Sequence, residues 1–316
     1  MKICFVDPNY LLANTNAEIS VGLLTVATAL RDADDTHDLF YLNPKESPHV
    51  SQSEVAQKYA NEIYYLNPDV VMITTRIDYY LFVLYLSNYL REIGYEGKII
   101  LGGPQATHTA EETLKTWKSI DFIIIGEGEV TAPELIFALE NNSNLNDVKG
   151  IMFRTEKKIV CTEERARLQE ISIIPDYKLV FPIIKKFKQK YIRVEAGRGC
   201  AYRCLYCSTS VMWHGTDILK DAKILLKEMY TLKKESDIDG FIFEKDNLII
   251  KNKKSIDFLK NIAKYNIHHF KWKCSVRIDC LSEEIIKLLK KAGCIEVYLG
   301  IETGSKKMQR IYKKKS

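Results

Sequence analysis

Three cysteines stand close together in the stretch 197–210, GRGCAYRCLYCSTS. Cys200 is followed after three residues by Cys204, and Cys204 after two residues by Cys207. Three thiolates at this spacing on one loop can each bind one iron of a four-iron cluster, which leaves the fourth iron open to a small molecule. The spacing therefore predicts a metal site on a single short loop.

A structural zinc ion is the competing interpretation, and such sites take four protein ligands. The nearest candidates for a fourth ligand are His214, seven residues after Cys207, and Cys274, 67 residues after it. Iron–sulfur clusters also usually take four cysteines. The missing fourth ligand favours a reactive cluster over a structural metal, and the specificity of the motif argues against three unligated thiols.

The first 140 residues have the pattern of a doubly wound α/β domain. Helical patterns separate five short apolar runs, whose composition is typical of strands buried on both faces of a parallel sheet. The runs cover residues 2–6, 38–42, 69–74, 98–103 and 121–126. In such a flavodoxin-like sheet, ligands bind beyond the carboxyl ends of the strands.

A second alternation follows, with strands predicted at 191–196, 239–244, 270–276 and 295–302 and helices at 217–236, 252–265 and 282–292. The cysteine loop follows the first of these strands, and in a β/α barrel such loops lie on the carboxyl face, where catalytic groups collect. We expect an N-terminal domain over 1–145, a linker with a small hairpin over 146–190 and a barrel domain over 191–316.

The composition indicates a two-domain protein without a membrane-spanning segment. Of the 316 residues 46% are hydrophobic, which is enough for two cores, and no apolar run is long enough to cross a membrane. The N-terminus has no signal-peptide pattern, so we expect a cytoplasmic protein whose eight cysteines are ligands and core residues. Residues 1–150 carry a net charge of −11, and residues 151–316 carry a net charge of +16. The lysines of the basic half lack the interleaved aromatic residues of a nucleic-acid surface, so we do not expect nucleic-acid binding.

The cysteine motif, with Tyr206 before its last cysteine, resembles the signature of radical S-adenosylmethionine (radical SAM) enzymes. The resemblance implies that Cys200, Cys204 and Cys207 hold a 4Fe–4S cluster whose fourth iron is chelated by S-adenosylmethionine. It further implies one-electron cleavage of that cosubstrate to a 5′-deoxyadenosyl radical, and a flavodoxin- or ferredoxin-like electron donor. RGCAYRCLYC is similar to the form found in members with an N-terminal cobalamin-binding domain.

The same resemblance assigns further contacts to S-adenosylmethionine: Tyr206 on the cysteine loop, Asp246 after the second barrel strand, Arg277 after the third and Glu302 after the fourth. Arg277 would clamp the methionine carboxylate, and Glu302 would reach the ribose or the amine. A salt bridge at the barrel mouth is the alternative role for both. Lys245 departs from the family pattern, because an acidic residue usually precedes Asp246.

The first domain resembles the cobalamin-type domain of these enzymes through SVGLLTVATALRD, PDVVMITT, ILGGPQAT and DFIIIGEGEVTAPEL. Thr74, Gly102, Gly103, Gly126 and Gly128 follow its third, fourth and fifth strands, where glycine lets a large flat ligand approach the backbone.

The Asp-x-His-x-x-Gly motif that supplies an axial histidine to cobalt is absent, and we expect His37 to be a surface loop residue. The resemblance therefore implies cobalamin without a histidine ligand. A domain that has lost the cofactor and serves as a scaffold is the alternative.

The sequence thus favours a cobalamin-dependent methyltransferase acting on an unactivated carbon. Alternatives are a radical SAM cyclase or rearrangement enzyme and a non-catalytic cluster-binding protein. Methylthiotransferases are disfavoured, because only Cys4 and Cys161 precede Cys200 and a second cluster needs three cysteines. Family barrels have six strands, so the four predicted here imply a truncated chain, or one that needs a partner or a missing C-terminal segment.

Overall fold

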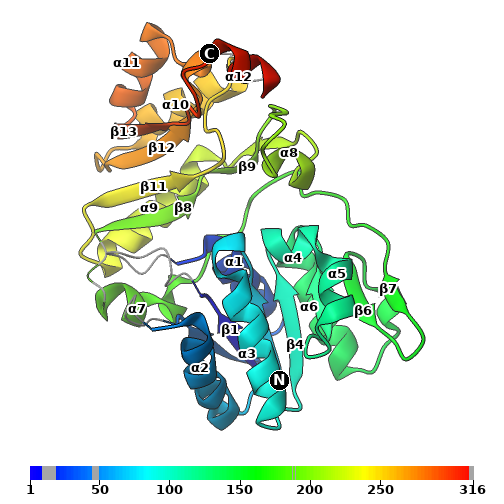
Figure 1. Ribbon diagram of the computed structural model, residues 1–316. Coiled ribbons are helices and arrows are strands. Elements are labelled where there is room, and N and C mark those ends of the chain that lie inside the picture. Colours follow the sequence, from blue (N-terminus) through cyan, green and yellow to red (C-terminus); the bar gives the residue numbers. More distant parts are fainter. Residues whose placement is uncertain (9–18, 45–49, 187, 189, 313–316) are drawn as a thin grey trace. The chain divides into compact units, whose positions relative to one another are not determined.

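The computed structural model describes residues 1–8, 19–44, 50–186, 188 and 190–312 (Figure 1). The chain divides into two compact units. Met1–Arg167 and Pro175–Phe187 form the first, whereas Leu168–Ile174 and Lys188–Ser316 form the second. Within the described residues, every helix is too short or too polar to cross a membrane.

A seven-stranded sheet runs through the first unit in the order β2-β1-β3-β4-β5-β6-β7. Its first five strands are parallel, as the apolar runs predict. They are β1 (Lys2–Val6), β2 (Asp38–Leu42), β3 (Val70–Thr74), β4 (Lys98–Gly102) and β5 (Phe122–Ile124). The order confirms the flavodoxin-like class, in which ligands bind at the carboxyl edge of the sheet.

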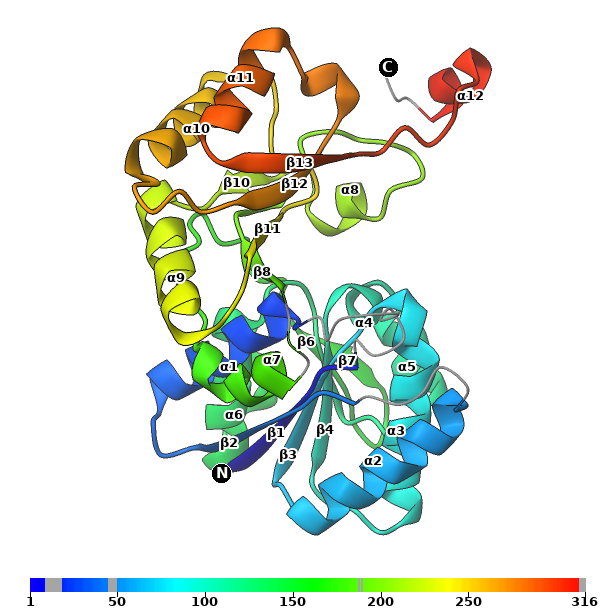
Figure 2. The same cartoon turned by 90° about the vertical axis from the view of Figure 1, so that its left-hand side faces the viewer.

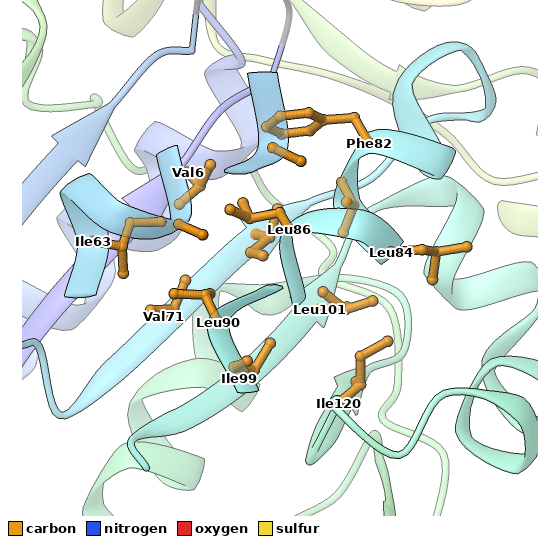
Figure 3. Close-up of a cluster of buried hydrophobic side chains, with 14 of the residues drawn as sticks. Val6, Ile63, Val71, Phe82, Leu84, Leu86, Leu90, Ile99, Leu101 and Ile120 are labelled. Atoms are coloured by element: carbon orange, nitrogen blue, oxygen red, sulfur yellow. The ribbon is translucent and has the colours of Figure 1, made fainter. Parts of the chain in front are cut away.

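Successive side chains of these strands alternate between two apolar cores. Cys4 and Val6 join the core formed with α2 (Gln52–Leu66) and α3 (Tyr80–Glu92), which Figure 3 shows around Leu86 and Leu101. The intervening residues of β1 join the core formed with helices α1 (Val21–Ala33) and α6 (Gly128–Glu140). Burial on both faces explains why β1, β3, β4 and β5 consist mostly of apolar residues.

The hairpin expected in the linker over 146–190 lies instead in the first sheet. Strand β6 (Ile151–Arg154) pairs antiparallel with β5, and β7 (Ile159–Cys161) pairs antiparallel with β6. The segment that follows also packs on this unit: the Asp176 amide donates to Thr28 Oγ1 at 2.8 Å, and the Asp176 carboxylate pairs with Arg31. The short helix α7 (Phe181–Lys186) also belongs to this unit.

A four-stranded parallel sheet in the order β13-β12-β11-β8 forms the second unit. Its strands are β8 (Tyr191–Glu195), β11 (Gly240–Glu244), β12 (Trp272–Val276) and β13 (Cys294–Leu299). The helices that connect them, α9 (Ala222–Glu235), α10 (Lys253–Tyr265) and α11 (Glu283–Lys291), lie beside one another along this sheet (Figure 2). Helices α9, α10 and α11 lead into β11, β12 and β13 in turn, which is the β/α repeat expected.

The helix predicted from residue 217 begins later, at Ala222. Asp221 is its N-cap and accepts hydrogen bonds from the amides of Lys223 and Ile224. Residues Asp217–Leu219 form β10, which pairs antiparallel with β9 (Gly197–Gly199). The prediction was wrong here because the pairing partner lies on the other side of the cysteine loop.

Candidate functional site

The three cysteines lie on the loop between β9 and the single-turn helix α8 (Thr209–Met212). All three are free thiols, with Cys204 buried and the other two partly buried. The Cys207 amide donates to the Cys204 carbonyl at 3.1 Å, which folds the second half of the loop into a turn. Gly199 begins the loop with φ of +73°, and a Cβ there would lie 2.0 Å from the Thr216 carbonyl oxygen. Only glycine fits where β9 and β10 approach so closely.

The sulfur atoms do not gather around one point, as the ligands of a single ion would. The described residues hold one group of three candidate ligand atoms that all lie within 4.8 Å of one another, and it contains none of these cysteines. Zinc binds thiolates at about 2.3 Å and would draw them together. Cysteines on a four-iron cluster bind separate irons, so the donor set fits a cluster.

Neither candidate for a fourth zinc ligand supports a zinc site. His214 is exposed, with a left-handed backbone (φ 49°). Cys274 is buried inside β12, where hydrogen bonding to the Cys294 thiol and burial raise its pKa. Burial also raises the pKa of Cys200, against an opposing effect of the Lys245 ammonium. Removal of that proton therefore has to accompany metal binding.

Lys245, the residue that departs from the family pattern, holds the start of the cysteine loop. Its side chain is fully buried. Its Nζ donates to the Gly199 and Asn247 carbonyl oxygens, each at 2.9 Å, and pairs with the Asp217 carboxylate. An ammonium group has three protons, and three acceptors meet it here. The lysine thus joins the end of β11 to both strands that frame the loop.

Arg277 follows β12 and contacts one of the three cysteines, Cys204. Its Nε and Nη2 donate to the two carboxylate oxygens of Asp279 at 3.0 and 2.8 Å, and its Nη1 donates to Cys204 Sγ at 3.2 Å. The guanidinium carbon lies 3.9 Å above the Tyr202 ring. Asp279 holds the pKa of Arg277 above its ordinary value although burial opposes this. Asp279 and Tyr202 were not predicted from the sequence.

Of the other predicted cosubstrate contacts, Tyr206 lies on the loop and Asp246 contacts the helix that follows the loop. The Tyr206 ring packs edge-to-face on Tyr312 with centroids 5.1 Å apart, and Asp246 accepts a hydrogen bond from Thr209 Oγ1 at 2.9 Å. Glu302 is exposed beyond the end of β13, with φ of +63°.

In the first unit, Thr74, Gly102 and Gly103 meet at the carboxyl edge of the sheet. Thr75 Oγ1 donates to the Gly102 carbonyl oxygen at 2.7 Å and accepts from the Ala106 amide at 2.8 Å. Gly103 has φ of +91°, and a Cβ there would lie 2.8 Å from the Thr75 carbonyl oxygen. A Cβ at Gly102 would meet no atom within 4 Å. The turn is therefore tightly packed at Gly103 and open at Gly102, and the open position fits the approach of a large ligand.

The two glycines after β5 have different surroundings. A Cβ at Gly126, where φ is +79°, would lie 2.3 Å from Nη1 of Arg167, so the arginine covers this glycine. A Cβ at Gly128 would lie 2.8 Å from Val26 Cγ2. Gly128 thus allows close packing of α6 on α1, a role that the sequence pattern does not distinguish from ligand contact.

His37 is not the surface residue that was predicted. Its side chain is 4% exposed, and its Nε2 lies 3.0 Å from Glu140 Oε1 at the end of α6. The prediction was wrong because a residue far along the chain covers the ring. His37 precedes β2, at the amino edge of the sheet, so it lies away from the edge where ligands bind.

Two family models match the chain. Residues 15–136 match the B12 binding domain, and residues 194–316 match the Radical SAM superfamily. The chain therefore combines a B12-binding domain with a domain of the radical SAM superfamily. The cysteine loop, Lys245 and Arg277 thus lie in its radical SAM domain, and the glycine turn lies in its B12-binding domain.

Curated relatives of this radical SAM protein include two classes. An uncharacterized methyltransferase of Pyrococcus horikoshii is 27% identical over 76% of this chain and 52% of its own length. An anaerobic magnesium-protoporphyrin IX monomethyl ester cyclase of Cereibacter sphaeroides is 27% identical over 100% of this chain and 53% of its own. The chain therefore spans about half the length of these relatives.

Among solved structures, the radical SAM methyltransferase TsrM of Kitasatospora setae, with cobalamin and an iron–sulfur cluster bound, has a similar fold. The TM-score is 0.76 at 15% identity, over 100% of this chain and 61% of that one. The likeness supports the fold of the radical SAM protein described above.

Proposed function

We propose that this chain is the cobalamin-dependent radical SAM part of an enzyme that transfers a methyl group to an unactivated carbon. The observation that carries the proposal is the loop of three free, separated thiols next to Arg277. A cluster bound there would supply the electron for the reductive cleavage of S-adenosylmethionine. The matches to both family models and to methyltransferases support it.

In this proposal Cys200, Cys204 and Cys207 hold the 4Fe–4S cluster. Tyr206, Asp246 and Glu302 contact S-adenosylmethionine. The positive charge of Arg277 attracts the methionine carboxylate. A bidentate contact through Nε and Nη2 would have to displace Asp279, because these two atoms already donate to its carboxylate. Lys245 is excluded from ligand contact by its burial and its three acceptors, so its role is to fix the loop.

Residues of the B12-binding domain would hold cobalamin. Thr74, Gly102 and Gly103 supply an open backbone edge and a hydroxyl group, and we include Gly126 and Gly128 as neighbours of that edge. The Asp-x-His-x-x-Gly motif is absent, and the His37 side chain is buried at the opposite edge of the sheet. We therefore propose that cobalamin is bound without a histidine ligand to cobalt. An electron donor and a substrate are required by the radical SAM class, and we propose a flavodoxin- or ferredoxin-like donor. The free thiols of all eight cysteines fit a cytoplasmic location.

A cyclase is the second candidate. The relatives named as magnesium-protoporphyrin IX monomethyl ester cyclases align over as much as 100% of this chain, more than the methyltransferase of Pyrococcus horikoshii does. Both reactions begin at the same cluster, so the cysteine loop does not separate them.

Anaerobic reconstitution with iron and sulfide tests the proposal. We expect about four irons per wild-type chain and far fewer in Cys204→Ser. Cys161→Ser is the matched control, because Cys161 is a free, exposed thiol in the other domain. A wild-type chain that binds one zinc and no sulfide contradicts the proposal.

The fate of S-adenosylmethionine then separates the two candidates. Methyl transfer predicts S-adenosylhomocysteine together with 5′-deoxyadenosine when cobalamin is present. A cyclase predicts 5′-deoxyadenosine alone. A chain that binds the cluster and cobalamin but never consumes S-adenosylmethionine in the presence of a strong reductant would support a non-catalytic role.

A further inference from the structure

The guanidinium of Arg277 is fixed on three sides. Asp279 binds it through two parallel hydrogen bonds, and the Tyr202 ring lies against its flat face. Its third side points at Cys204, whose sulfur accepts a hydrogen bond from Nη1 at 3.2 Å. The arginine side chain is only 10% exposed, so water competes weakly for these donors.

Such a bond has a defined effect on a metal-bound thiolate. A positively charged N–H donor stabilises the state with more negative charge on sulfur. The reduced form of an iron–sulfur cluster carries one electron more than the oxidised form, and hydrogen bonds to its sulfur atoms help to set its reduction potential. The arginine should therefore favour the reduced form.

We propose that Arg277 raises the reduction potential of the cluster through its bond to Cys204 and that Asp279 is the positioning residue that aims it. This inference depends on the proposed function, because it requires a cluster on the three cysteines. It gives Arg277 a role that a salt bridge at the barrel mouth would not have. Asp279 is essential to it, since a guanidinium free to rotate would spend less time near the sulfur.

The test is a potential titration of the reconstituted full-length chain, followed by the electron paramagnetic resonance signal of the reduced cluster. Arg277→Met should lower the ratio of reduced to oxidised cluster about tenfold at a fixed potential, which is about 59 mV for a one-electron couple. Asp279→Glu keeps the charge but moves the carboxylate, so its potential should fall by less. Arg203→Met is the matched control, because Arg203 is exposed on the same loop one residue before Cys204.

Iron and sulfide are counted before any potential is measured. A wild-type chain without a cluster refutes the proposed function itself, whereas a loaded Arg277→Met chain with the wild-type potential overturns only this inference. An equal shift in Arg203→Met also overturns it, because the effect would then be one of overall charge. If Arg277→Met does not assemble a cluster, Asp279→Glu decides: a lower potential supports the inference and an unchanged one refutes it.

Discussion

Replacement of Lys245 by Met should destabilise the radical SAM domain even without a cluster. Methionine has a similar length but no donors, so the Gly199 and Asn247 carbonyl oxygens and the Asp217 carboxylate lose their shared partner. The Asp217 side chain is only 11% exposed, so water replaces the ammonium poorly. Removal of one partner from a buried ion pair costs about 3–5 kcal/mol. With a slope of about 2 kcal/mol per molar urea, the midpoint should fall by about 2 M.

Tryptophan fluorescence can follow this domain by itself. Trp213 and Trp272 lie in the second unit and Trp117 in the first, so a Trp117→Phe background reports only the unit that contains Lys245. Lys260→Met is the control, since Lys260 is exposed on α10 and its loss should change the free energy of unfolding by no more than about 0.5 kcal/mol. The reasoning is refuted if Lys245→Met unfolds at the same urea concentration as this control.

Three further outcomes are expected. Gly103→Ala should destabilise the B12-binding domain by about 1–3 kcal/mol in thermal unfolding, because φ is +91° and the Cβ would meet the backbone; Gly22→Ala, with open space in α1, should be neutral or stabilising. Hydrogen bonding to Cys274 lowers the pKa of Cys294, so iodoacetamide should alkylate Cys294 at lower pH than in Cys274→Ala, as peptide mass spectrometry can measure. Ser51→Ala removes the N-cap of α2 and should cost about 1 kcal/mol in urea unfolding.

The fold was largely predictable because local patterns determine it. The apolar runs gave β1 to β5, since residues buried on both faces of a parallel sheet must be apolar at every position. Pairings between distant segments were not predictable. The hairpin β6–β7 was expected, but nothing local shows that it joins β5. Strand β10 was assigned to a helix because its partner β9 lies across the cysteine loop.

For the candidate site, the sequence again supplied the local part. Spacing alone singled out the three cysteines as candidate ligands, and the resemblance singled out Arg277. Their neighbours required the structure: Asp279 follows Arg277 by two residues, a spacing with no special meaning in sequence, and Tyr202 meets it from the loop. His37 was misassigned because Glu140, 103 residues away, covers it.

The division into two units places residues 168–174 with the radical SAM domain and residues 175–187 with the B12-binding domain. The polypeptide therefore passes from one unit to the other three times, and no single cut separates them cleanly. A fragment that ends at residue 145 would lack β6, β7 and the Asp176 contacts to α1, and its sheet would expose β5 as a new edge. A protease that cuts once near residue 168 would leave an N-terminal product made of the first unit alone, and a C-terminal product that still carries residues 175–187 of the first unit. Recombinant separation of the two halves would need a rearranged gene in which residues 175–187 are joined to the first product and 168–174 to the second.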